Sequence, residues 1–263
     1  MCFRHDAEPP ELPPHLRRPI AVADVERLTL TSADGTPFSV AVALAADGAG
    51  RPAVVILPDV RGLYPFYEQL AQRFAQAGHH AIVVDYFGRT AGLGPRDDDF
   101  DYWPHTRAAE AHTIRDDIAA AAAALGERTG ADAFVTVGFC FGGTNAFLSA
   151  TYEELPLAAA VGFYGGLDPE AHGMQVPSPV ERASATRVPV LALFGGADEG
   201  IPQHRIDAYA AGLREAGVEA AVHVYPGAPH SFFDRAFAQF ADESSDAWDR
   251  VLTFIAHRSR ATS

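Results

Sequence analysis

The chain has 263 residues, 48% of them hydrophobic, which is enough for one large α/β domain with a filled core. Its net charge of −14 argues against binding to nucleic acid or to anionic membrane surfaces, since both need basic patches. Two cysteines, Cys2 and Cys140, exclude a disulfide scaffold and a four-thiolate metal site. Neither a signal peptide nor an apolar run of about 18 residues is present, so we expect a cytoplasmic protein with reduced thiols.

Residues 1–20 are rich in proline and charge, and we expect them to form an extended arm without a core of its own. Residues 21–263 are then a single domain. Its first elements are two strands with alternating polar and apolar residues, at 25–31 and 38–44. The sequence Ser32-Ala33-Asp34-Gly35 between them is a turn signal, which predicts an antiparallel hairpin.

From residue 53 onward, strands and helices alternate. Buried strands are predicted at 53–57, 81–84, 133–137, 157–163, 188–194 and 221–225. Helices are predicted at 65–77, 106–125, 144–151, 203–216 and 244–257. This order is typical of an α/β fold, with a mostly parallel central sheet, helices on both faces and an antiparallel N-terminal hairpin.

The most informative motif is Gly138-Phe139-Cys140-Phe141-Gly142, which follows the strand at 133–137. It has the spacing of a nucleophile elbow with cysteine in the serine position, and it predicts the α/β-hydrolase fold. Small residues are needed on both sides of the nucleophile because the turn brings strand and helix close together. The helix N-terminus that follows would favour a thiolate. The alternative is a buried cysteine in a glycine-rich turn.

A nucleophilic thiol needs a base, and the base needs a residue that orients it. In this fold the chain order is nucleophile, acid, histidine. Asp198 follows the strand at 188–194, and His230 follows the strand at 221–225. Both would lie at the same sheet edge as Cys140, so we predict a catalytic triad of these three residues. Taken singly, Asp198 could be a turn residue and His230 a surface histidine.

Further candidates follow the other strands that end at this edge. We predict an oxyanion hole made by the backbone N–H groups of Val60 and Phe141. Arg89 could bind a substrate carboxylate, or it could be a surface arginine.

Residues 91–105 are acidic and aromatic, and they form either a lid that walls the pocket with Tyr102 and Trp103 or a solvated loop. Tyr64 and Tyr86 also lie near strand ends, where they could contact substrate.

Together these residues resemble the dienelactone hydrolase (carboxymethylenebutenolidase-like) family. The matching segments are Leu57-Pro58-Asp59-Val60-Arg61-Gly62-Leu63, Asp85-Tyr86-Phe87-Gly88-Arg89, Gly138-Phe139-Cys140-Phe141-Gly142-Gly143 and His230-Ser231-Phe232-Phe233. The resemblance covers residues 25–258. It implies hydrolysis of small esters or lactones by a cysteine, histidine and aspartate triad, through a thioester, with neither a metal nor an organic cofactor. It also implies that Arg89 binds the substrate carboxylate.

The sequence departs from the family pattern at two positions. Well-studied members carry a glutamate where this chain has Asp59, and that glutamate holds the resting thiol and accepts its proton. We expect Asp59 to take this thiol-modulating role, although its side chain is one methylene shorter. A second substrate-binding arginine of the family is replaced by Asp234, with Arg235 one position further on.

These departures leave two other functions open. The first is a general carboxylesterase or thioesterase that acts on neutral acyl groups. The second is a non-catalytic binding protein on the hydrolase scaffold. In each case we expect a small-molecule ligand and a monomer or homodimer.

Overall fold

The computed structural model describes residues 7–17, 24–94, 96–256 and 258. Its strands are β1 (Val25–Thr31), β2 (Pro37–Ala43), β3 (Ala53–Leu57), β4 (Ala81–Val84), β5 (Phe134–Phe139), β6 (Leu157–Phe163), β7 (Val190–Gly195) and β8 (Ala220–Tyr225). Its α-helices are α1 (Pro65–Gln76), α2 (Gly88–Ala91), α3 (Tyr102–Ala108), α4 (Ala111–Thr129), α5 (Phe141–Ser149), α6 (Pro179–Arg182), α7 (Gln203–Ala216) and α8 (Ala241–Ala256). Two 3₁₀ turns, η1 (Pro169–His172) and η2 (Ala183–Ala185), lie between β6 and β7.

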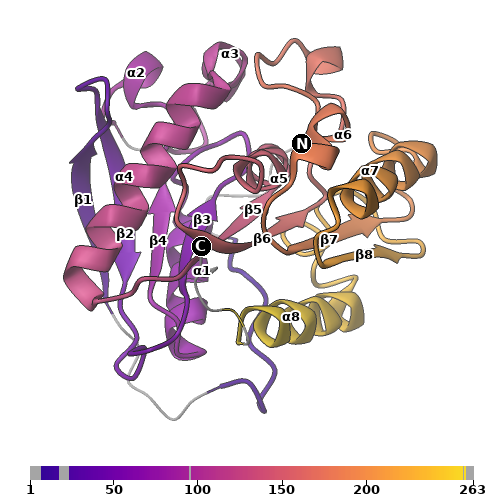
Figure 1. Cartoon of the computed structure of the whole chain (residues 1–263). Coiled ribbons are helices and arrows are strands. Elements are labelled where there is room, and N and C mark those ends of the chain that lie inside the picture. The colour runs from indigo at the N-terminus through magenta and orange to yellow at the C-terminus, as the bar shows by residue number, and fades with distance from the viewer. Residues whose placement is uncertain (1–6, 18–23, 95, 257, 259–263) are drawn as a thin grey trace.

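The eight strands form one sheet in the order β1-β2-β4-β3-β5-β6-β7-β8. The pairs β1–β2 and β2–β4 are antiparallel, and all other neighbours are parallel. Figure 1 shows the sheet crossing the molecule from β1 on one side to β8 on the other. The predicted fold class is therefore confirmed, including the N-terminal hairpin.

The core lies on both faces of this sheet, because each central strand buries both of its faces. In β3, Val54 and Ile56 pack on the side covered by α1 and α8. Val55 and Leu57 pack on the opposite side, against α4. The apolar run that predicted this strand therefore supplies both layers of the core.

The segment at 91–105 differs from the expected loop, and the helix after it is split. Helix α3 begins at Tyr102, and Pro104 sits in its first turn, where the missing N–H of proline is harmless. Ala109 is extended and ends α3. Helix α4 then runs past Gly126 to Thr129, because the left-handed C-cap that terminates it is Gly130.

The described part of the N-terminal arm, residues 7–17, lies against the domain. Leu12 is buried in the core, and the indole N–H of Trp248 in α8 donates a hydrogen bond to the carbonyl of Pro10 (3.2 Å). Glu11 forms an ion pair with Arg73 of α1. The arm thus packs against α1 and α8, whereas Cys2 lies outside the described residues.

Over the described part of the chain, no helix is both long enough and apolar enough to cross a membrane. The same residues contain no group of three His, Cys, Asp or Glu side chains placed to hold a metal ion.

Candidate active site

Cys140 lies at a sharp turn between the central strand β5 and helix α5. Its backbone has φ 54° and ψ −114°, a strained conformation for a non-glycine residue. A Cβ atom at Gly138 would collide with the carbonyl of Gly142, and a Cβ at Gly142 would collide with the carbonyl of Leu57. The two glycines are therefore required by backbone packing, and the turn has the geometry of a nucleophile elbow.

The structure brings the three residues of the predicted triad together. Asp198 and His230 lie in the loops after β7 and β8, at the sheet edge where β5 ends. Atom Nδ1 of His230 hydrogen-bonds Oδ2 of Asp198 at 2.6 Å, and the imidazole lines the same cavity as Cys140. The other carboxylate oxygen, Oδ1, accepts the N–H of Gly200 (3.0 Å), which fixes the orientation of the buried Asp198.

The protonation of His230 follows from these neighbours. Burial lowers its pKa, but the negative charge of Cys140 and the hydrogen bond to Asp198 outweigh that effect and raise the pKa to about 11. His230 is therefore an imidazolium at neutral pH in the resting protein. It is oriented by Asp198 and lines the same cavity as Cys140.

Two backbone N–H groups beside Cys140 are available to an incoming carbonyl oxygen. Phe141 is the first residue of α5, and Val60 lies in the loop after β3. Within the described residues, neither N–H donates a hydrogen bond to the protein. Both residues line the same cavity as Cys140. The ring of Tyr86 packs edge-on against Phe141 (5.4 Å between centroids) and supports this side of the cavity.

The cavity has a volume of about 330 Å³. Six predicted site residues line it: Asp59, Val60, Trp103, Cys140, Phe141 and His230. Further lining residues, to which the sequence analysis gave no role, come mainly from the loops after β6, β7 and β8: Thr144, Gly166, Pro169, His172, Met174, Gly200, Ile201, Ser231 and Arg235. Arg61 and Tyr102 complete the lining. The positions of these loops gave a usable signal, because loops after parallel strands gather at one sheet edge.

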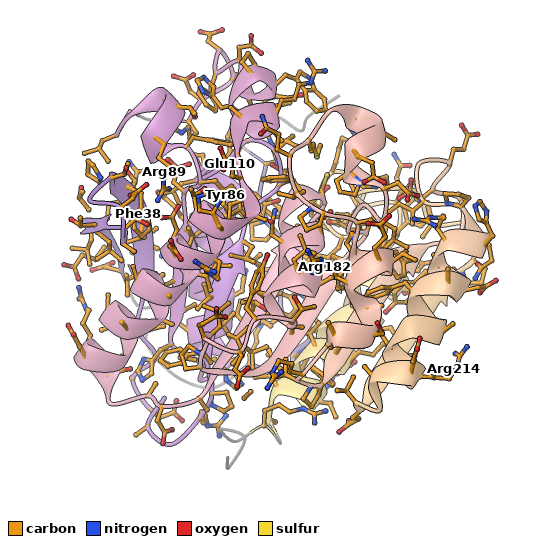
Figure 2. The ribbon with its side chains drawn as sticks, turned by 45° about the horizontal axis from the view of Figure 1, so that its top comes forward. Phe38, Tyr86, Arg89, Glu110, Arg182 and Arg214 are labelled. Carbon is orange, nitrogen blue, oxygen red and sulfur yellow. The ribbon has the colours of Figure 1, made fainter. Side chains whose placement is uncertain are left out.

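The structure does not bring Arg89 to this cavity. Its guanidinium forms ion pairs with Asp117 of α4 (2.8 Å) and Asp34 of the hairpin turn (2.7 Å), and it donates a hydrogen bond to Ser32. Figure 2 shows Arg89 beside Phe38 on the side of the molecule that carries β1 and β2. The geometry thus gives this arginine structural partners and offers no support for contact with substrate.

Tyr64 and Tyr86 also lie outside the cavity lining. The hydroxyl of Tyr64 donates to Asp98 (2.5 Å), and the hydroxyl of Tyr86 donates to the carbonyl of Pro58 (2.9 Å). Both are buried, and they support the loop that carries Asp59 and Val60. Of the predicted aromatic contacts, Tyr102 and Trp103 of the 91–105 segment line the cavity.

Asp59 forms an ion pair with Arg61 (2.5 Å), and both side chains are buried. Among the described residues, no hydrogen bond joins Asp59 to Cys140. In the structure the carboxylate of Asp59 is therefore paired with Arg61, whereas the prediction had paired it with the thiol of Cys140.

A second buried carboxylate, Asp234, accepts a hydrogen bond from the hydroxyl of Tyr164 (2.8 Å). Burial and the nearby charge of Asp59 raise the pKa of Asp234 to about 6, although Tyr164 and Arg61 oppose this shift. The ring of Tyr164 also contacts the imidazole of His230 (5.0 Å between centroids). Asp234 therefore helps to hold Tyr164, which in turn packs against His230 in the loop after β8.

Comparison with known proteins agrees with this fold. Residues 40–259 match the dienelactone hydrolase family. The chain is 30% identical over 230 residues to a Salmonella typhimurium protein named "putative carboxymethylenebutenolidase", covering 85% of this chain and 83% of that one. It is 27% identical over 271 residues to a carboxymethylenebutenolidase of Rhodococcus opacus, covering 97% of this chain and 96% of the relative.

A solved structure gives the same result. The crystal structure of a Klebsiella pneumoniae protein, described as a "putative dienelactone hydrolase", superimposes with a TM-score of 0.75 at 27% identity. The superposition covers 89% of this chain and 99% of the other. The chain belongs to the dienelactone hydrolase family and is a hydrolase of esters or lactones.

Proposed function

We propose that this enzyme cleaves small esters or lactones with Cys140 as nucleophile and a thioester intermediate. The observation that carries the proposal is that Cys140, at the elbow, lines one cavity with His230, which Asp198 holds by a hydrogen bond. The backbone N–H groups of Val60 and Phe141 lie at the same cavity, and neither donates to another described residue. The attacking form of a cysteine is its thiolate, and a neighbouring imidazolium such as that of His230, whose pKa is raised to about 11, favours that form.

The reaction has two stages. In the first, the sulfur of Cys140 attacks the carbonyl carbon, and the N–H groups of Val60 and Phe141 hold the oxyanion. The C–O bond then breaks, the leaving alkoxide takes a proton from His230, and a thioester remains. In the second, neutral His230 removes a proton from water, the hydroxide attacks the thioester, and the acid leaves as the thiolate re-forms.

Trapping the intermediate tests this mechanism. Wild type mixed with an aryl acetate and quenched in acid should carry one acetyl group on the peptide that contains Cys140. The variant Cys140→Ala should carry none and should lose turnover while its thermal unfolding stays cooperative. Full turnover in Cys140→Ala, or an acetyl group on another residue, would refute the assignment.

The cation that meets an anionic substrate in this proposal is Arg235 rather than Arg89. Arg235 is exposed and lines the cavity next to Ser231. Its guanidinium forms neither an ion pair nor a hydrogen bond with another described residue. A carboxylate on the substrate can therefore pair with it without breaking an existing contact.

A specific observation also favours neutral acyl substrates as a second candidate. Apolar side chains make up much of the cavity wall: Val60, Tyr102, Trp103, Phe141, Pro169, Met174 and Ile201. The two candidates separate in the ratio of kcat/KM for a dienelactone carboxylate to that for an aryl acetate. We expect Arg235→Gln to lower this ratio and Arg89→Gln to leave it unchanged. Equal ratios in wild type and Arg235→Gln would favour the general esterase.

We also propose that the enzyme acts in the cytoplasm, where reducing conditions keep the thiol of Cys140 available for catalysis.

A further inference from the structure

In the segment Asp59-Val60-Arg61, the side chain of Asp59 bonds both the backbone and the side chain of Arg61, so the two contacts bridge Val60. Oδ1 of Asp59 accepts the backbone N–H of Arg61 (2.9 Å) and Nε of the same arginine (3.0 Å). Oδ2 accepts the terminal guanidinium nitrogen Nη2 (2.5 Å). Asp59 and Arg61 are 7% and 4% exposed, so these contacts are shielded from water, which strengthens them electrostatically. They hold the two residues on either side of Val60.

The carbonyl side of Val60 is held from helix α3. The hydroxyl of Thr106 donates to the carbonyl oxygen of Val60 (3.2 Å), and Thr106 is fully buried. The same hydroxyl proton is shared with the carbonyl oxygen of Tyr102 one turn earlier, which also accepts from Thr106 (2.9 Å). The helix that contributes Tyr102 and Trp103 to the cavity wall therefore also fixes the orientation of the Val60 peptide.

The guanidinium is fixed on its outer side as well. It stacks over the ring of Tyr64, 4.4 Å from the centroid, and the hydroxyl of Tyr64 bonds Asp98. Gly62, at φ 73°, donates its N–H to the carbonyl of Asp59 (3.1 Å) and turns the chain away. Every residue adjoining Val60 in the chain is thus held by at least one buried contact.

We call the contacts made by Asp59, Arg61 and Thr106 around the Val60 peptide the Val60 clamp. Two physical arguments indicate its role. A buried ion pair contributes little net stability, because desolvation of both charges offsets their attraction. An oxyanion donor, in contrast, must be held within about 0.5 Å of its working position to stabilise the transition state. A rigid, buried clamp around one peptide is what such a donor requires.

We infer that Arg61 and Thr106 are positioning residues that hold the N–H of Val60 toward the oxyanion, and that Asp59 serves in this clamp instead of accepting the thiol proton of Cys140. The inference rests on the proposed function. Among the described residues, the donors that hydrogen-bond the Asp59 carboxylate all belong to Arg61, and they engage both of its oxygens.

Two reactions of the same sulfur separate these roles. Ester hydrolysis builds an oxyanion, whereas alkylation by iodoacetamide displaces iodide from carbon and builds none. A residue that positions the oxyanion donor should affect only the first reaction. A residue that controls the thiol should affect both.

The main variant is Thr106→Val, which removes the hydroxyl and keeps the shape, with Thr106→Ser as the matched control. We expect Thr106→Val to lower kcat/KM for an aryl acetate about 10-fold, less than the loss of a whole donor. Its alkylation rate should match wild type, and Thr106→Ser should recover most of the lost hydrolysis. Asp59→Asn and Arg61→Lys should show the same split, with thermal unfolding confirming that each variant is folded.

Several results would overturn the inference. One is an Asp59→Asn variant whose alkylation rate, or its pH profile, changes as much as its hydrolysis. Another is a Thr106→Val variant with wild-type hydrolysis while Cys140→Ala is inactive. Hydrolysis that persists in Cys140→Ala would instead refute the proposed function, and the inference with it.

Discussion

The buried carboxylate of Asp234 predicts a measurable pH dependence of stability. Asp234 is 2% exposed and faces Asp59, Arg61 and the hydroxyl of Tyr164. The variant Asp234→Asn keeps the size of the side chain and an acceptor for Tyr164, but it removes the charge. Any difference between the two proteins that varies with pH therefore reports the cost of ionising Asp234 in the fold.

The magnitude follows from the pKa. Its value is about 6 in the folded protein, against 3.8 for the ordinary group, so the native state holds the proton over this interval and the unfolded state does not. A raised carboxyl pKa makes the native state less stable as pH rises between the two values. Two pKa units correspond to about 3 kcal/mol. This penalty is absent below pH ~4 and complete above pH ~6.

Urea unfolding at pH 4.5, 5.5, 6.5 and 7.5 measures this effect for wild type, Asp234→Asn and Glu215→Gln, an exposed carboxylate on α7 that controls for the loss of one charge. We expect the free energy of unfolding of wild type, relative to Asp234→Asn, to fall by about 2 kcal/mol across this range. A difference that is independent of pH, or one that grows in favour of wild type, would refute the reasoning.

Three further predictions concern other parts of the fold. Cys140→Ala should lower kcat by at least about 10³-fold in an esterase assay without lowering the urea midpoint. Gly142→Ala should prevent cooperative folding, as followed by circular dichroism, because its Cβ would overlap the carbonyl of Leu57. Arg89→Met should lower the free energy of unfolding by about 3–5 kcal/mol, because it leaves Asp117 buried without its cation, while KM for a carboxylate substrate stays unchanged. A large rise in that KM would restore Arg89 to the substrate site.

The parallel sheet and the elbow were predictable because their signals are local. Uniformly apolar runs such as 53–57 and 157–163 are typical of strands buried on both faces. Gly138 and Gly142 flank Cys140 at the spacing that the elbow requires. The order of Cys140, Asp198 and His230 after successive strands then placed all three at one edge of the sheet.

The ends of the helices were less accessible to sequence reasoning. Gly126 was expected to end the helix before β5, yet α4 continues through it to the left-handed cap at Gly130. A Cβ at Gly126 would press on the ring of Phe134 and the carbonyl of Ala131, so this glycine serves helix-to-strand packing. Which of two glycines ends a helix is decided by such contacts.

The sequence by itself determined the fold class and the chain order that brings Asp198 and His230 to the sheet edge of Cys140, because the signals for strands and turns are encoded within a few neighbouring residues. The tertiary structure decided which charges pair. Arg89 binds Asp34 and Asp117, 55 and 28 positions away, and Asp59 binds Arg61 beside a cavity wall formed by α3. Which residue a charged side chain pairs with depends on which groups the whole fold buries beside it. Removal of water makes an unpaired charge costly only after the chain has folded, so the pairing is decided by the tertiary structure.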